Sequence, residues 1–87
     1  MTKKERTFYR QAAQKAMKEN GMKVFQKDII LLETGCSYET VLDIKIQIVD
    51  YVMFEDNRTG KQFQCWYGAK YYNADLDTLW FVQEYAP

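Results

Sequence analysis

The feature that most constrains the fold of this chain is a run in which branched apolar residues alternate strictly with polar ones. The apolar members hold even positions and the polar members odd ones: Leu42, Ile44, Ile46 and Ile48, separated by Asp43, Lys45 and Gln47. Because successive side chains of a strand point to opposite faces, the pattern predicts a β-strand with one buried face. Apolar even positions resume at Val52 and Phe54 after the exception of Asp50, which favours one long strand over residues 40–56.

A turn signal follows this strand and sets its pairing with the next one. Asn57-Arg58-Thr59-Gly60 has the composition of a type I turn closed by a glycine bulge. On one surface the turn predicts the pairs Asp56–Lys61, Phe54–Phe63, Val52–Cys65, Asp50–Tyr67 and Ile48–Ala69. On the opposite surface it predicts Glu55–Gln62, Met53–Gln64, Tyr51–Trp66 and Val49–Gly68.

The first twenty residues predict an amphipathic helix. Thr2 and Glu5 have the spacing of a capping box, and neither glycine nor proline interrupts the segment before Gly21, which supplies a left-handed stop. Apolar residues recur at helical intervals within it: Phe8, Ala12 and Ala16, flanked by Tyr9, Ala13 and Met17. We expect Phe8 and Met17 to anchor this helix on a sheet.

The remaining elements complete an expected α+β domain over residues 1–87. Residues 23–33 are typical of a first strand, with residues 35–38 as its turn, and residues 78–85 favour a last strand because their apolar run is short and bulky. We therefore expect an N-terminal amphipathic helix packed on a four-stranded antiparallel β-meander. In the alternative, the last element is a helix and the order is αβββα.

The residues that most enzymes and metal sites use are scarce in this chain. It has no histidine, two cysteines without a CxxC pair, and no glycine-rich phosphate loop. The close acidic pairs, Glu55-Asp56 and Asp75-x-Asp77, fall at expected turns, where aspartate is favoured for local hydrogen bonds. We therefore expect no catalysis, no cofactor and no metal site.

Charge is divided between the two parts of the chain although the net charge is zero. Residues 1–32 carry eight basic and three acidic side chains, and residues 33–87 carry four basic and nine acidic ones. A basic helix on an acidic sheet is expected. Apolar runs reach only four residues, so we expect no membrane span and a location in the cytoplasm, here that of a bacterial host.

The length of the second strand predicts surface that one helix leaves uncovered. A strand over residues 40–56 would span about 50 Å, whereas a helix of eighteen residues spans about 27 Å. Either the strand bends near Asp50 or its part toward the Asn57–Gly60 turn protrudes. In the second case two apolar clusters need a covering partner: Val52, Phe54 and Phe63 on one side, and Tyr51, Met53 and Trp66 on the other.

These features predict a non-catalytic binding protein that covers a surface of another macromolecule. The most concrete version is a phage or mobile-element inhibitor of a bacterial defence nuclease, of the anti-CRISPR or anti-restriction type, because lysine outnumbers arginine nine to three as in AT-rich genomes. Tyr51, Met53 and Trp66 would be apolar anchors. Carboxylates would imitate phosphates in a basic nucleic-acid channel of the partner: Glu55, Asp56, Asp75 and Asp77.

Two alternatives remain open from the sequence. A small nucleic-acid-binding regulator would use the basic helix, with phosphate contacts from Lys3, Arg6, Arg10 and Lys18. Nucleic acid is the less favoured partner because the aromatic sheet is acidic. The third possibility is a structural homodimer formed through the Trp66 patch.

Overall fold

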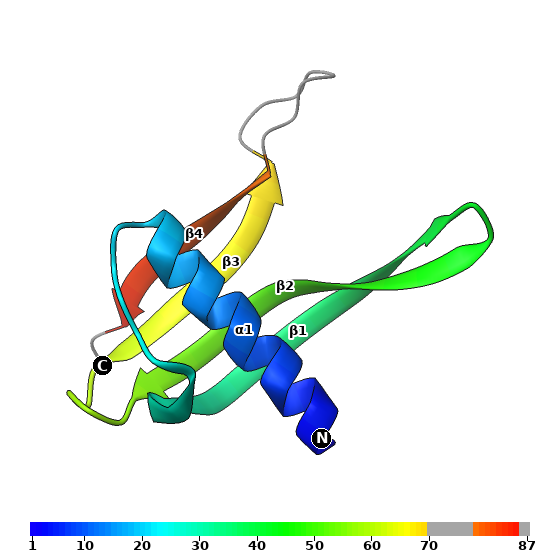
Figure 1. The fold of residues 1–87 in the computed structure, drawn as a ribbon. Helices are drawn as coiled ribbons and strands as arrows, with labels where there is room; N and C mark the ends of the chain where they lie inside the picture. Colours follow the sequence, from blue (N-terminus) through cyan, green and yellow to red (C-terminus); the bar gives the residue numbers. More distant parts are fainter. Residues whose placement is uncertain (70–77, 86–87) are drawn as a thin grey trace.

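The computed structural model describes residues 1–69 and 78–85, and Asp75 and Asp77 lie outside these ranges. The elements follow in the order α1 (Lys3–Glu19), η1 (Gln26–Asp28), β1 (Ile29–Val41), β2 (Ile44–Asp56), β3 (Gln62–Ala69) and β4 (Thr78–Tyr85). The four strands form one antiparallel sheet in the order β1-β2-β3-β4, and α1 crosses one of its faces (Figure 1). The expected α+β fold is confirmed, and the last element is a strand.

Helix α1 begins and ends at the expected residues. The Glu5 N–H donates to Thr2 Oγ1 at 3.1 Å and the Thr2 N–H donates to the Glu5 carboxylate at 3.4 Å, so the capping box is formed. The chain leaves the helix through Gly21 at φ +73°. Its buried side chains are Tyr9, Ala13, Ala16 and Met17, and Phe8 is 38 % exposed. The expectation that Phe8 anchors the helix is therefore wrong, because Tyr9 occupies the central line of contact.

The core lies between α1 and the facing side of the sheet. Val52, Phe54 and Cys65 are fully buried there, and Phe54 stacks on Phe63 with ring centroids 5.6 Å apart. The other buried members of this cluster are Val24, Ile29, Val49 and Trp80. Side-chain hydrogen bonds tie the helix and its C-terminal cap to the sheet, and one of them is the bond that the Trp80 N–H donates to the Glu19 carboxylate at 3.4 Å. Asn20 Nδ2 donates to the Trp80 carbonyl at 2.9 Å, and Arg10 Nε donates to the Ile29 carbonyl at 3.2 Å.

The β2–β3 hairpin has the register that the turn predicts. Five expected pairs are formed: Tyr51–Trp66, Val52–Cys65, Met53–Gln64, Phe54–Phe63 and Glu55–Gln62. The Asp56 N–H donates to the Lys61 carbonyl at 2.8 Å, and Gly60 adopts φ +75°. Within the described residues the pairing stops at Tyr51–Trp66, so the expected pairs of residues 48–50 with residues 67–69 are wrong.

The turn between the first two strands lies later in the chain than the sequence indicates. Residues 35–38 belong to β1, and the reversal falls at Leu42 and Asp43. The two strands pair along their whole length, with one extra residue accommodated at Leu32 in β1 and one at Asp50 in β2. This long ladder outweighs the local turn preference of Gly35 and its neighbours.

The bulge at Asp50 shifts the alternation of β2 by one residue. Toward the start of β2, the next buried residue before Val52 on the core side of the sheet is Val49, not Asp50 or Ile48. Val49 is 6 % exposed. The Asp50 carboxylate accepts a hydrogen bond from Ser37 Oγ at 3.0 Å. The sequence predicts that the isoleucines of the alternating run are buried, and this is wrong: Ile44 and Ile46 are exposed, and Ile48 is only partly buried.

The part of the β1–β2 hairpin formed by residues 37–48 is called the arm below. It leaves the body of the molecule beside the N-terminal half of α1, while β3 and β4 run in another direction (Figure 1). The expectation that β2 protrudes toward the Asn57–Gly60 turn is therefore wrong, because the protruding segment lies at the opposite end of the strand. Val52, Phe54 and Phe63, expected to need a partner, are core residues.

Candidate functional site

One face of the sheet has no helix on it. The register places the side chains that alternate with the core residues on this side, which is called the open sheet face. They are Ile30, Glu33, Tyr51, Met53, Glu55, Gln62, Gln64, Trp66, Phe81, Gln83 and Tyr85. Figure 1 shows α1 on the other side. The open sheet face is a candidate binding surface that spans all four strands in the described parts of the chain.

An aromatic row crosses the open sheet face. Tyr51 pairs with Trp66, and Trp66 pairs with Phe81, so three neighbouring strands each contribute one ring. The Trp66 and Phe81 rings stack with centroids 5.8 Å apart and planes 17° apart. Gly35 continues the row on β1 and adds no side chain over Tyr51. The indole of Trp66 is held in a fixed orientation by its neighbours and remains 38 % exposed.

The charged groups of the open sheet face are both acidic. Within the set defined above, Glu33 and Glu55 are the only ionisable residues besides the two tyrosines, and none of these described residues is a lysine or an arginine. Burial and the nearby Glu33 carboxylate raise the pKa of Tyr51, in that order of importance, so this phenol stays a neutral hydrogen-bond donor. Gln62 Nε2 donates to the Glu55 carboxylate at 3.4 Å. The row is therefore bordered by amides and carboxylates.

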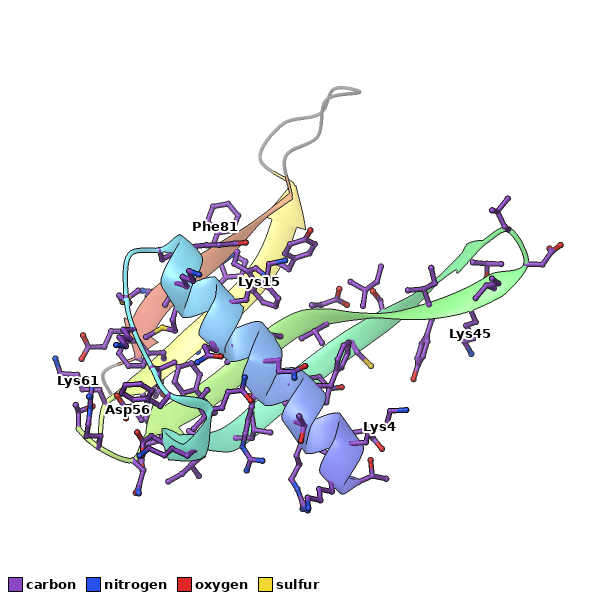
Figure 2. The ribbon with its side chains drawn as sticks, in the orientation of Figure 1. Lys4, Lys15, Lys45, Asp56, Lys61 and Phe81 are labelled. Atoms are coloured by element: carbon purple, nitrogen blue, oxygen red, sulfur yellow. The ribbon has the colours of Figure 1, made fainter. Side chains whose placement is uncertain are left out.

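The structure brings four of the expected partner-binding residues together and separates one. Tyr51, Met53, Glu55 and Trp66 share the open sheet face. Asp56 does not: its side chain is 5 % exposed, and its Oδ1 accepts a hydrogen bond from the Arg58 N–H at 3.0 Å. This carboxylate stabilises the β2–β3 turn. Figure 2 labels Asp56 and Lys61 at that end of the sheet.

The basic residues of the alternative site have different surroundings. Lys3, Arg6 and Lys18 are exposed on α1, whereas Arg10 bonds the Ile29 carbonyl and is partly buried. A cationic cluster that is not predicted from the sequence surrounds the exposed ring of Phe25. Lys23 Nζ, Lys27 Nζ and the Arg58 guanidinium carbon lie 4.9, 5.9 and 5.7 Å from its centroid. The Lys-x-Phe-x-Lys spacing is visible in the sequence, but the arrival of Arg58 depends on the fold.

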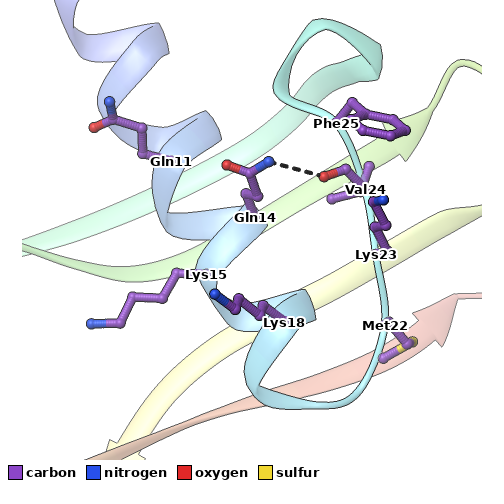
Figure 3. Close-up of a pocket in the computed structure, with 8 residues that line it drawn as sticks. All are labelled: Gln11, Gln14, Lys15, Lys18, Met22, Lys23, Val24 and Phe25. Carbon is purple, nitrogen blue, oxygen red and sulfur yellow. Dashed lines mark hydrogen bonds between the residues drawn. The ribbon is translucent and has the colours of Figure 1, made fainter.

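A groove that Phe25 helps to line separates α1 from the segment that follows the helix. It has a volume of about 630 Å³, and Figure 3 shows the residues that line it: Gln11, Gln14, Lys15, Lys18, Met22, Lys23, Val24 and Phe25. Gln14 Nε2 donates to the Val24 carbonyl at 3.2 Å, which fixes the segment against the helix. Three ammonium groups border this groove, so its electrostatic character is opposite to that of the open sheet face.

The two thiols lie in different environments. Cys65 is fully buried, and burial raises its pKa to about 12. Cys36 is exposed, and its hydrogen bond to Tyr9 is the main cause that raises the pKa of that phenol. No three histidine, cysteine, aspartate or glutamate side chains gather as metal ligands within residues 1–69 and 78–85. In the same residues no helix is long and apolar enough to cross a bilayer.

Comparisons with protein-family models, with curated proteins and with solved structures find no match to this chain. Its function has to be inferred from its own surfaces.

Proposed function

We propose that the protein is a non-catalytic binding module that docks its open sheet face onto a protein partner. The observation that carries this proposal is the Tyr51–Trp66–Phe81 row, which crosses three strands on a face that the helix does not cover. A monomer that bound nothing would gain no stability from leaving stacked aromatic rings in contact with water. Tyrosine and tryptophan held rigidly in such a row are typical anchors of protein interfaces.

The charge of the open sheet face favours protein over nucleic acid as the partner. Stacking surfaces for nucleic acids need cations that follow the phosphate backbone, and the charges beside the row are those of Glu33 and Glu55. Carboxylates next to aromatic anchors suit a basic surface of a partner.

The most specific form of the proposal is an inhibitor of a bacterial defence nuclease, carried by a phage or mobile element. A nuclease binds its substrate in a basic channel, and an acidic aromatic face is complementary to such a channel. In this form Trp66 is the central anchor, and Glu33 and Glu55 replace phosphates at its border. Asp56 is not part of the contact because it is buried in the turn.

Affinity capture tests the docking face directly. The wild-type chain, Trp66→Ala and the matched helix variant Lys18→Ala are immobilised and exposed to the same bacterial lysate. We expect a partner that the wild type and Lys18→Ala retain and that Trp66→Ala loses, because truncating a central anchor costs about 2 kcal/mol or more, roughly thirtyfold in Kd. A partner retained by Trp66→Ala and lost by Lys18→Ala would refute this use of the face.

Phage plating tests the inhibitor form. The chain is expressed in strains that carry a restriction or CRISPR defence, and the plating efficiency of a sensitive phage is measured. We expect the wild type and Lys18→Ala to restore plating against the targeted defence and Trp66→Ala to fail. Equal restoration by Trp66→Ala would contradict the proposal.

A second candidate function is supported by the cations around Phe25. Three cationic side chains within 6 Å of an exposed ring are suited to a phosphate backbone with a stacked base. If this function operates, labelled single-stranded DNA or RNA should bind with strong salt dependence, and Lys23→Ala with Lys27→Ala should reduce the salt slope by about two. Fluorescence anisotropy at several salt concentrations measures this, with Trp66→Ala as the variant that should bind normally.

A further inference from the structure

The sheet divides into two branches, and the division leaves one edge of β2 without a neighbouring strand. Within the described residues, β2 pairs with β1 over Ile44–Asp56 but with β3 only over Tyr51–Glu55 (Figure 1). In a two-residue hairpin the closing pair, here Val41 and Ile44, exchanges both backbone hydrogen bonds. Alternate residues then turn their N–H and C=O groups away from β1. The outward groups are those of Lys45, Gln47 and Val49, so this edge offers a template for another strand.

The arm carries a row of isoleucines that no part of the described chain covers. Ile44 and Ile46 are 64 % and 44 % exposed, Ile48 is partly buried, and the spacing of two places all three on one face of the ribbon. Lys45 lies on the other face, where its ammonium group is 4.4 Å from the centroid of the Tyr38 ring; Figure 2 labels it. An isolated two-stranded ribbon is marginally stable in water. An additional strand on the free edge would stabilise it.

The tip of the arm adopts a left-handed backbone conformation that leucine disfavours and aspartate tolerates. Leu42 and Asp43 have φ values of +51° and +63°, where asparagine followed by glycine is the usual choice. Leu42 is also 90 % exposed, so its side chain gains little from packing on the described residues that could offset the strain. A strained, exposed leucine at a loop tip is the arrangement expected of a residue that enters a binding site elsewhere.

A pocket lies where the two branches separate. It has a volume of about 340 Å³ and is lined by Phe8, Gln11, Ala12, Lys15, Ile48, Val49, Tyr67 and Trp80. Most of this lining is apolar, and Lys15 supplies the one charged group. Leu42 would match the apolar lining of this pocket, and the carboxylate of its neighbour Asp43 would match the ammonium group of Lys15.

From these observations we propose that two copies of this chain pair antiparallel through the free edges of their arms, about a two-fold axis at Ile46. In this register Ile46 faces Ile46 of the second copy, Ile44 faces Ile48, and position 45 pairs with position 47. The outward backbone groups of Lys45 meet those of Gln47, so the hydrogen-bond phase of the two edges agrees. Each tip then reaches Val49 and Asp50 of the other copy, where Leu42 fills the pocket and Asp43 approaches Lys15.

Other strand pairings of the arm fit less well. An axis at Lys45 would place two ammonium groups opposite each other. The outer edge of β1 carries a bulge at Leu32, next to the exposed Glu33 carboxylate, and both are features that protect an edge from pairing. The register centred on Ile46 is the one that matches all three isoleucines.

Sedimentation of the full-length chain tests the proposal. We expect the wild type to form, at micromolar concentration, a species of twice 10.4 kDa, and Ile46→Lys and Ile46→Asp each to sediment as single chains. Because position 46 faces itself, an equimolar mixture of Ile46→Lys and Ile46→Asp should restore the dimer. Folding of both variants is checked by circular dichroism, and the restoration itself shows that they are folded.

Two further variants separate this dimer from other associations. Trp66→Ala, on the open sheet face, should leave the dimer intact. Leu42→Asn relieves the turn strain, so it should raise the melting temperature of the Ile46→Lys monomer but weaken the wild-type dimer at least about tenfold. The proposal is overturned if the wild type remains a single chain at all concentrations, if the mixture does not associate, or if Trp66→Ala and not Ile46→Lys dissolves the dimer.

Discussion

Three carboxylates of β2 have different roles that their residue type does not reveal. Glu55 lies on the open sheet face, Asp56 is buried and accepts a backbone hydrogen bond, and Asp50 accepts from Ser37 at a bulge. The sequence places all three beside an expected turn or strand but cannot say which of them faces solvent. The Asp56 carboxylate is excluded as a binding group because it is buried and accepts a backbone hydrogen bond, whereas the Glu55 carboxylate lies on the open sheet face, where Gln62 donates to it.

The contribution of the Asp56 carboxylate to the stability of the turn can be measured. Replacing Asp56 with alanine leaves the Arg58 N–H without its acceptor, and we expect a loss of about 1 to 3 kcal/mol in the free energy of unfolding by urea. Asp56→Asn retains an acceptor oxygen and should cost less. Glu33→Ala, at an exposed position, should change stability by no more than about 0.5 kcal/mol. Equal losses for Asp56→Ala and Glu33→Ala would show that Asp56 is not structural.

The two cysteines should differ sharply in reactivity. Burial raises the pKa of Cys65 to about 12, so its reactive thiolate is scarce at any pH below that value, and its sulfur is also shielded from solvent. Mass spectrometry after iodoacetamide treatment at pH 8 should find the label on Cys36 alone. Cys65 should react only after denaturant is added, and its labelling in the native protein at that pH would contradict the described core.

At the scale of elements, some boundaries follow from local chemistry and others do not. The capping box, the left-handed Gly21 and the Asn57–Gly60 turn are local signals. The helix predicted from them is confirmed, and so are the five β2–β3 pairs nearest the turn. The sequence misplaces the β1–β2 reversal because Gly35 has turn character, whereas Leu42, the first residue of the actual turn, does not. Bulges make it harder to predict which side chains are buried. The extra residue at Asp50 puts the even-numbered side chains before it on the opposite face from those after it.

The exchange of faces predicts opposite outcomes for two apolar residues of β2. Phe54 is fully buried, and Phe54→Ala should destabilise the chain by about 3 to 5 kcal/mol. Ile44 shares its alternating pattern in the sequence but lies on the arm, so Ile44→Ala should change monomer stability by no more than about 0.5 kcal/mol. Urea denaturation at low protein concentration measures both. A large loss for Ile44→Ala would place the isoleucine row inside the core.

At the scale of the whole molecule, one helix on one face of the sheet produces two surfaces of opposite character. The helix and the segment after it are basic, and the open sheet face is aromatic and acidic. The register of the Asn57–Gly60 turn is enough to place Tyr51, Met53 and Trp66 on one face. The sequence does not place Phe81 and Tyr85 on a face, because that requires the register between β3 and β4. The sequence of residues 70–77, between those strands, carries no turn signal as specific as Asn57–Gly60.

The exposure of Trp66 and its burial by a partner form the central claim, and fluorine NMR tests both. The full-length chain is labelled with 5-fluorotryptophan, which gives one resonance each for Trp66 and Trp80, and Trp66→Phe assigns them. A soluble gadolinium chelate should broaden the Trp66 signal strongly and the Trp80 signal weakly, because Trp80 is buried. Addition of the captured partner should protect Trp66. Equal protection of both tryptophans in the free chain, or a complex in which Trp66 stays as accessible as before, would contradict the account.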